Sequence, residues 1–353
     1  MADYSLADRL LHRLALGPRI LGDIAFDVEK SLYLKTAPSH GDKPHVFVSG
    51  LARAGTTILM RALYDSGQFA SLTYNDMPFV LCPNLWSRVS GLSQSKRPAQ
   101  ERAHGDGIMV DVQSPEALDE VFWRVFEGKT YIHADKLVPH TPAPETIHAY
   151  GDYMRLVMRR HGKARYLTKN NNTILRLPAI RESFANAIFL IPLRDPLAHA
   201  HSLLAQHIRF RDADEFTQSY MTWLGHHEFG ATHRPFRLPV PIEEIGTPNE
   251  LDYWIQQWIQ YYTYVEQLLD RAPERCYLIP YEDLCAVPEV WARLAEIVQI
   301  DLGDCPQFRI SDRSLDPACA PERLRLARQL YSRLQDCALE QLACDRAPSK
   351  SPQ

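Results

Sequence analysis

Three features are missing from this chain of 353 residues, and each absence excludes a class of protein. No basic excess is present, since 39 Lys and Arg residues face 43 Asp and Glu residues for a net charge of −4, whereas general nucleic-acid binders are usually basic. No apolar run approaches the ~18 residues that a membrane span needs. The seven cysteines are odd in number and form no C-x-x-C pair, which disfavours a disulfide framework or a zinc knuckle. We therefore expect a cytoplasmic protein that binds no nucleic acid and no metal.

The chain divides into three expected parts. Residues 1–43 form a helical leader, because four leucines recur at near-helical spacing beside Arg9 and Arg13. This helix is expected to pack on the domain, and a peripheral contact with a membrane surface is the alternative. Residues 44–346 are expected to form one domain, and residues 347–353 a disordered tail.

Short apolar runs alternate with helical patterns along the predicted domain. Four strands are expected at 45–50, 165–168, 187–191 and 275–279. Helices are expected to start at Ser114 and Pro248, to cover residues 145–161, and to follow the strands. Residues 87–112 and 229–247 are expected to be loops, and a stripe over 251–262 is expected to be core. This alternation predicts a mostly parallel sheet covered on both faces, a three-layer α/β/α fold.

Residues 50–57, Gly-Leu-Ala-Arg-Ala-Gly-Thr-Thr, follow the first expected strand and open a helix. Small residues let the backbone wrap around an anion, and the free N–H groups of a first helical turn point at it. Arg53 adds a positive charge, and the Thr56 and Thr57 hydroxyls can donate further hydrogen bonds. The two glycines have Walker A spacing, but Thr56 stands at the lysine position. The segment predicts a site for a phosphate-like group, and a plain strand–helix turn is the alternative.

A second basic turn follows the third expected strand. Arg194-Asp195-Pro196 ends that strand, and Ser202 lies eight residues after Arg194 on the next helix. An arginine can give paired charge-assisted hydrogen bonds to a phosphate, and a serine adds a hydroxyl. The spacing alone is a weak signal. Together with the upstream loop in one sheet, it predicts a second phosphate contact.

These segments together resemble the sulfotransferase family, whose members take a sulfuryl group from 3′-phosphoadenosine 5′-phosphosulfate (PAPS). Residues 53–57 are similar to the family's 5′-phosphosulfate loop, and closer to the R-S-G-T-T form of Golgi and tyrosylprotein members than to the cytosolic K-S-G-T-T-W form. Residues 281–284, Tyr-Glu-Asp-Leu, are similar to a segment common in the family. The resemblance implies a P-loop-like fold and metal-independent PAPS binding by Arg53, Ala54, Gly55, Thr56, Thr57, Arg194 and Ser202.

Sulfuryl transfer to a hydroxyl needs a base for the acceptor proton and cations at the charged oxygens. Cytosolic members use a K-x-H histidine, and its counterpart at residues 168–172 keeps Lys169 but has no histidine. Golgi-type members use a carboxylate after the first helix, and Asp76 lies in that region, 23 residues after Arg53. The resemblance therefore implies Asp76 as the base, with Lys169 and Arg53 as catalytic cations. A helix-capping role for Asp76 is a compatible alternative.

Other parts of the family pattern have weaker counterparts. Ile58 stands where cytosolic members have a tryptophan beside the adenine, so no adenine-stacking residue is assigned. Arg313 or Arg323 is the candidate for a C-terminal phosphate contact. The adjacent histidines at 226 and 227 cannot share a helical face, which disfavours a metal site. His207, Phe210, His226 and His227 are expected either to line the acceptor pocket or to pack.

The predicted function is sulfuryl transfer from PAPS to a hydroxyl of a carbohydrate, a lipid-linked glycan or a small metabolite. A P-loop nucleotide kinase is one alternative, although the missing Walker A lysine handicaps phosphoryl transfer. A non-catalytic nucleotide-binding protein is another, and the absent K-x-H histidine supports it.

Overall fold

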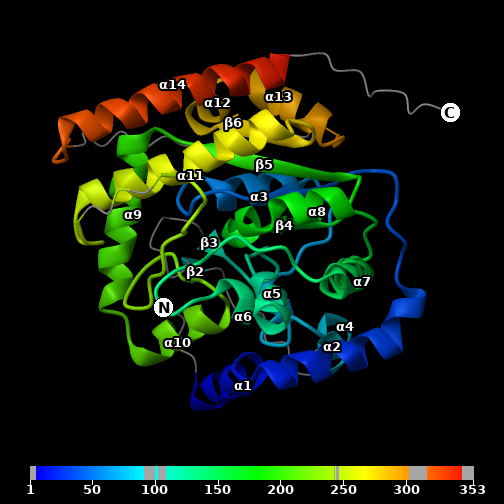
Figure 1. The fold of residues 1–353 in the computed structure, drawn as a ribbon. Coiled ribbons are helices and arrows are strands. Elements are labelled where there is room, and N and C mark those ends of the chain that lie inside the picture. Colours follow the sequence, from blue (N-terminus) through cyan, green and yellow to red (C-terminus); the bar gives the residue numbers. More distant parts are fainter. Residues whose placement is uncertain are drawn as a thin grey trace.

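The computed structural model describes residues 5–90, 100–101, 109–241, 243, 246–301 and 316–343 (Figure 1). Its larger sheet has the strand order β4-β1-β5-β6, and all three neighbouring pairs are parallel. The strands are β1 (His45–Val48), β4 (Leu167–Lys169), β5 (Ala187–Leu193) and β6 (Cys276–Pro280). All four predicted strands are confirmed, each within two residues of its expected bounds.

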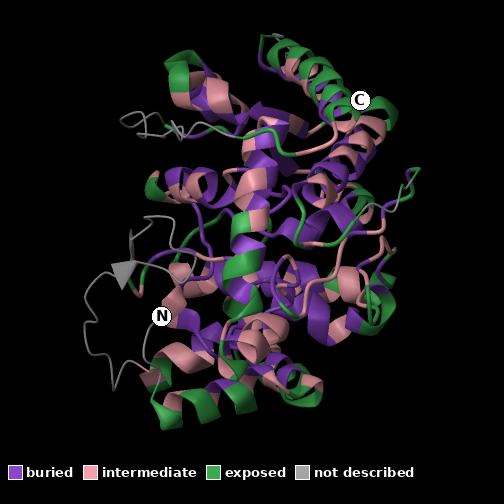
Figure 2. Cartoon of the chain, turned by 90° about the vertical axis from the view of Figure 1, so that its left-hand side faces the viewer, coloured by how far each residue is buried: buried purple, intermediate pink, exposed green. Residues whose placement is uncertain are grey.

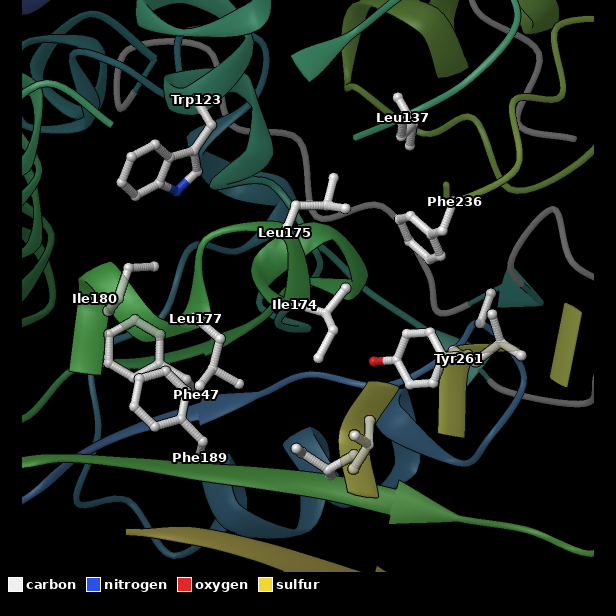
Figure 3. Close-up of a cluster of buried hydrophobic side chains, with 14 of the residues drawn as sticks. Phe47, Trp123, Leu137, Ile174, Leu175, Leu177, Ile180, Phe189, Phe236 and Tyr261 are labelled. Atoms are coloured by element: carbon white, nitrogen blue, oxygen red, sulfur yellow. The ribbon is translucent and has the colours of Figure 1, made fainter. Parts of the chain in front are cut away.

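Alternate residues of the strands enter two separate hydrophobic clusters, one on each face of the sheet. Phe47 of β1 and Phe189 of β5 stack with ring centroids 5.1 Å apart in the larger cluster, where Figure 3 shows them beside Leu177 and Ile180. Val48 of β1 belongs to the smaller cluster. Because successive strand side chains point to opposite faces, both faces are buried and the predicted three layers are confirmed.

Helices cover the two faces. The smaller cluster is closed by α3 (Thr56–Asp65) and α13 (Pro288–Ile297). The larger is closed by α7 (Pro144–His161), α9 (Pro196–Arg211) and α11 (Leu251–Arg271). The other elements are α1 (Leu6–Leu16), α2 (Arg19–Tyr33), η1 (Leu34–Thr36), η2 (Tyr74–Asp76), α4 (Pro83–Ser90), β2 (Gln100–Glu101), β3 (Met109–Val110), α5 (Glu120–Phe126), α6 (Gly128–Tyr131), η3 (Asn171–Leu175), α8 (Leu177–Ser183), α10 (Glu215–Trp223), α12 (Tyr281–Ala286) and α14 (Pro321–Ala343).

The predicted helix ends agree with the structure where a capping residue fixes the end of the helix. Helix α7 ends at Gly162, whose φ of 63° is left-handed and suits glycine. Helix α9 begins after Asp195, whose carboxylate accepts a hydrogen bond from the Ala198 N–H at 2.8 Å. The stripe on α11 is core, since Trp254 and Trp258 are buried.

Two predicted helix starts are wrong. No helix begins at Ser114, because its hydroxyl binds Asp111 and its segment pairs with residues 72–75; α5 starts later, at Glu120. Helix α11 begins at Leu251 rather than Pro248, since Thr247–Glu250 forms a turn before it. The expected loop over 87–112 also contains the end of α4, and most of its other residues lie outside the described ones.

The expected leader is two helices, α1 and α2, along the lower edge of the molecule (Figure 1). Their inner sides pack on the domain through buried residues such as Leu16 and Phe26. Among the described residues, no helix combines the length and hydrophobicity of a bilayer span. The predicted boundary at residue 346 and the tail lie outside the described residues.

Candidate active site at the carboxyl edge of the sheet

Residues 50–57, the predicted anion loop, connect β1 to α3 in a conformation that requires both of the loop's glycines. Gly55 has φ 98° and caps α3, and a Cβ there would lie 2.5 Å from the Tyr281 ring. A Cβ on Gly50 would lie 2.8 Å from the Thr56 side chain. Arg53 also has a positive φ, 72°. The turn is therefore tightly wound, with its helix N-terminus directed as an anion site requires.

The residues predicted for two phosphate contacts meet in the structure. Arg53 Nε donates to Ser202 Oγ at 3.2 Å, and Arg194 Nη1 donates to the Arg53 carbonyl at 2.9 Å. His199 is buried one turn before Ser202 and binds the Ala52 carbonyl through Nε2 at 2.7 Å. Burial and the nearby Arg194 charge lower the pKa of His199 to about 3. The neutral His199 side chain therefore stabilises the loop through its hydrogen bond to the Ala52 carbonyl. The turns after β1 and β5 thus form one basic site.

Residues 281–284 contact both turns of this basic site. The Tyr281 ring lies against Gly55, and the Arg194 guanidinium lies 5.5 Å from its centroid. Glu282 accepts a hydrogen bond from the Asp195 N–H at 3.0 Å, and Tyr331 donates to its other oxygen at 3.0 Å. The segment therefore holds the Arg194 turn in place.

A second polar cluster lies next to this loop, at the end of β4. Lys169 is the register partner of Val48, the last residue of β1, so it lies one strand away from the anion loop. Its charge acts on His226 and Glu228, and His226 Nδ1 lies 3.4 Å from Glu228 Oε1. The structure thus brings the predicted Lys169 and His226 together, although 57 residues separate them in the sequence.

Charges and hydrogen bonds shift the pKa values of this cluster against the effect of burial. Burial alone would lower the pKa of His226, but the Glu228 carboxylate and its hydrogen bond outweigh burial and raise it. Burial would likewise raise the pKa of Glu228, but His226, Lys169 and a hydrogen bond from Asn171 lower it. His226 Nε2 also lies 3.0 Å from the Ala117 carbonyl, so both ring nitrogens act as donors.

Three asparagines position this cluster where the cytosolic pattern has its histidine. Asn170 donates to Glu120 at 2.7 Å, Asn171 to Glu228 at 2.7 Å and Asn172 to the Gly225 carbonyl at 3.1 Å. Gly225 has φ 77°, and a Cβ there would lie 2.5 Å from Glu120. The asparagines therefore hold the His226 turn against β4.

Glu116 is a carboxylate of this cluster that the sequence did not single out as a site residue. It is half-buried, accepts hydrogen bonds from Tyr74 Oη and the Ala117 N–H, both at 2.9 Å, and raises the pKa of His226. Glu228 was likewise missed, although the His226-His227 pair beside it was singled out.

Asp76 lies in a different environment. Its side chain is fully buried, accepts hydrogen bonds from Thr73 and forms ion pairs with Arg160 at 3.2 Å and His161 at 3.1 Å. Burial alone would raise its pKa, but His161, Thr73 and Arg160 outweigh burial and lower it. The structure therefore shows a capping and ion-pairing role that joins η2 to α7, and the role as base stays a prediction.

The remaining predicted residues are packed or paired. His207 and Phe210 are buried on α9, where His207 lies against Trp254 and Phe210 stacks on Phe229. His227 is buried, and burial with the Arg234 charge lowers its pKa to about 4. These contacts show that the three side chains pack in the interior of the protein. An acceptor-binding role for them stays a prediction.

The two arginines proposed for a C-terminal phosphate contact have separate outcomes. Arg323 is paired with Asp252 at 2.5 Å, and Arg313 lies outside the described residues. Within the ranges that the structure describes, no three His, Cys, Asp or Glu side chains are grouped as metal ligands.

Comparison with known proteins assigns the family. A sequence model described as the sulfotransferase family matches residues 44–294, which include both basic turns and the His226 cluster. The chain belongs to the sulfotransferase family. Membership places this sulfotransferase among enzymes that transfer a sulfuryl group, on the P-loop-like fold of that family. No curated protein matches the sequence.

Solved sulfotransferases give only distant likenesses. Sulfotransferase STF1 from Mycobacterium tuberculosis H37Rv is 13% identical, with 96% of this chain and 86% of that chain covered and a TM-score of 0.45. STF9 from Mycobacterium avium is 14% identical over 91% and 75%, with a TM-score of 0.46. A sulfotransferase from Alicyclobacillus acidocaldarius is 16% identical over 85% and 95%, with a TM-score of 0.42.

Proposed function

We propose that this sulfotransferase moves the sulfuryl group of PAPS to a hydroxyl of a carbohydrate, a lipid-linked glycan or a small metabolite. The observation that carries the proposal is the convergence of Arg53, Ser202 and Arg194 on one site at the start of α3. PAPS presents a phosphosulfate and a separate 3′-phosphate, so it needs an anion-binding helix start together with a second basic contact.

We assign the roles as follows. The α3 N-terminus with Thr56 and Thr57 binds the 5′-phosphosulfate, and Arg194 with Ser202 binds the 3′-phosphate. PAPS supplies an activated sulfuryl group: the acceptor oxygen forms a bond to sulfur while the bond from sulfur to the bridging oxygen breaks. Lys169 lies next to the loop and stabilises the charge that develops on the leaving oxygen.

The acceptor proton needs a base that an incoming hydroxyl can reach. Glu116 suits this role better than Asp76, because it is only half-buried and belongs to the cluster of Lys169 and His226. Asp76 is sealed from solvent, and its contacts with Arg160 and His161 lower its pKa, which makes it a weaker and less accessible base.

The donor assignment is tested by thermal unfolding with 3′,5′-ADP, in parallel with ATP plus magnesium. A ligand that binds only the native state adds about 2.7 kcal/mol at 100 times its Kd. We expect stabilisation by 3′,5′-ADP, lost in Arg194→Ala and kept in Arg211→Ala, a control whose side chain is exposed and pairs with Asp212. Stabilisation by ATP with magnesium alone would favour the kinase alternative. Binding of 3′,5′-ADP without transfer of sulfate from PAPS to any acceptor of a broad panel would favour a non-catalytic protein.

A further inference from the structure

The two N-terminal helices carry an apolar face that the domain does not use. Most large hydrophobic side chains exposed among the described residues lie on α1 and α2, and Leu6 and Ile20 are exposed by 85% and 68%. Figure 2 shows exposed residues along the helices at this lower end of the molecule. The inner faces of the same helices already pack on the domain. The residues of the outer face are Leu6, Leu10, Leu14, Ile20, Leu21, Ile24, Val28 and Leu32.

The spacing of these residues makes a single stripe along each helix. On α1 they recur every four residues, and on α2 every three or four, which places them on one side of each helix. Large contiguous apolar patches are uncommon on monomers and mark interaction sites. The outer face of α1–α2 therefore fits a partner.

Opposite charges border the two stripes. Arg9 and Arg13 are exposed beside the α1 stripe, whereas Asp23 and Asp27 are exposed beside the α2 stripe. Within the chain Arg9 lies over the Phe216 ring and Asp27 pairs with Lys30, so the inter-subunit argument depends on Arg13 and Asp23. At 100° per residue, each charged pair lies on the same side of its own stripe when its helix is viewed from the N-terminus. Two antiparallel helices bring equivalent sides together, so the basic edge of α1 would meet the acidic edge of a second α2.

The distances along the chain agree with such a pairing. Helices α1 and α2 extend in opposite directions from a turn at Gly17 and Pro18 (Figure 1). A two-fold axis at this turn would place Arg13 opposite Asp23 of the second copy, because each lies about five residues from the turn.

The same axis aligns the outer residues. Arg9 would face Asp27 of the second copy, and Leu10 would face Ile24. We propose that this face is the interface of a homodimer, in which α1 of each copy packs antiparallel on α2 of the other. Hydrophobic contacts would then be flanked by the two symmetry-related pairs of Arg13 and Asp23.

The charges favour a second copy over a lipid surface. Helices that lie on anionic membranes carry Lys and Arg on their polar face, whereas Asp23 and Asp27 border the longer of these two stripes. The membrane contact that the sequence allowed is therefore the competing outcome of the test.

The test is sedimentation equilibrium of the full chain at micromolar concentration, with charge reversal. We expect a species of twice the monomer mass for the wild type. Arg13→Asp and Asp23→Arg should each weaken dimerisation at least tenfold, because each puts like charges opposite one another. The double variant should restore it, since the pairs reform with reversed sign.

Leu10→Ser, at a position exposed by 58%, should yield a monomer that unfolds cooperatively and has the circular dichroism spectrum of the wild type, and this spectrum is the control for folding. A wild type that is monomeric at all concentrations would overturn the proposal. So would a dimer indifferent to all four variants. A monomer that floats with vesicles containing phosphatidylserine, and loses flotation in Leu10→Ser, would assign the face to a membrane instead.

Discussion

Two carboxylates of this protein each lie beside a histidine and have their pKa lowered further by a nearby Arg or Lys, yet the surroundings of the two sites differ. Asp76 is held by His161 and Arg160, is fully buried and joins a turn to helix α7. Glu228 pairs with His226 and accepts a hydrogen bond from Asn171, and the charge of Lys169 at the end of β4 lowers its pKa further. The same types of residue therefore form a buried contact that joins two elements at one place, and a polar cluster at the sheet edge at the other.

The difference shows why residue type alone does not identify a catalytic group. In both places burial is outweighed by charge and hydrogen bonds, which lower the pKa of the carboxylate. Only the cluster at β4 lies next to the loop after β1, where the carboxyl ends of parallel strands collect functional groups. Position in the sheet, rather than the carboxylate itself, makes the distinction.

The largest expected effect concerns the base. Glu116→Gln should lower the rate of sulfuryl transfer by roughly 10²- to 10⁴-fold, since the amide cannot accept the acceptor proton. Binding of 3′,5′-ADP should be unchanged, because the donor residues are untouched. The measurement is the turnover of the variant with PAPS, beside the melting shift with 3′,5′-ADP. An active Glu116→Gln together with a folded but inactive Asp76→Asn would return the base to Asp76.

The second effect concerns stability at Asp76. Asp76→Asn should cost about 3 kcal/mol of unfolding free energy, because it leaves Arg160 beside a neutral partner in the interior. Urea unfolding measures this loss. The matched control is Glu296→Gln, since Glu296 pairs with Arg293 on the surface with 62% of its side chain exposed. The control should change stability by less than about 0.5 kcal/mol, and equal losses in both variants would contradict the assigned role.

The third effect is a pH dependence of opposite sign at the two sites. The raised pKa of His226 means that its pair contributes fully below the ordinary value of 6.5 and loses its effect as pH rises through the folded pKa. The lowered pKa of Asp76 means that its pair contributes above 3.8 and fails as pH falls through the folded pKa.

Urea unfolding at several pH values separates the two sites. The difference in stability between wild type and His226→Gln should shrink toward alkaline pH. The difference between wild type and Asp76→Asn should shrink toward acid pH. Two differences that shrink in the same direction would mean that one of the pairs is assigned with the wrong charge state.

Much of the framework could be predicted because its signals are local. Strands at 45–50 and 187–191 are short apolar runs, and Asp195 and Gly162 are caps that act on their own helix. The helix expected at Ser114 was wrong because residues 72–75 pair with that segment, and no local pattern contains a pairing across forty residues. The sequence shows the apolar periodicity of the leader, but it does not show that part of this apolar face is exposed to solvent.

The sequence by itself predicted the family, through the resemblance at residues 53–57 and 281–284, and predicted the anion loop, because a strand, two glycines, an arginine and two threonines fall within 13 residues. It also supplied Arg194 and Ser202 through their spacing on one turn. Only the tertiary structure decided that Asp76 is an interior ion pair and that Glu116, His226 and Lys169 share one cluster. Those contacts join segments more than 50 residues apart, and burial and charge act through space rather than along the chain.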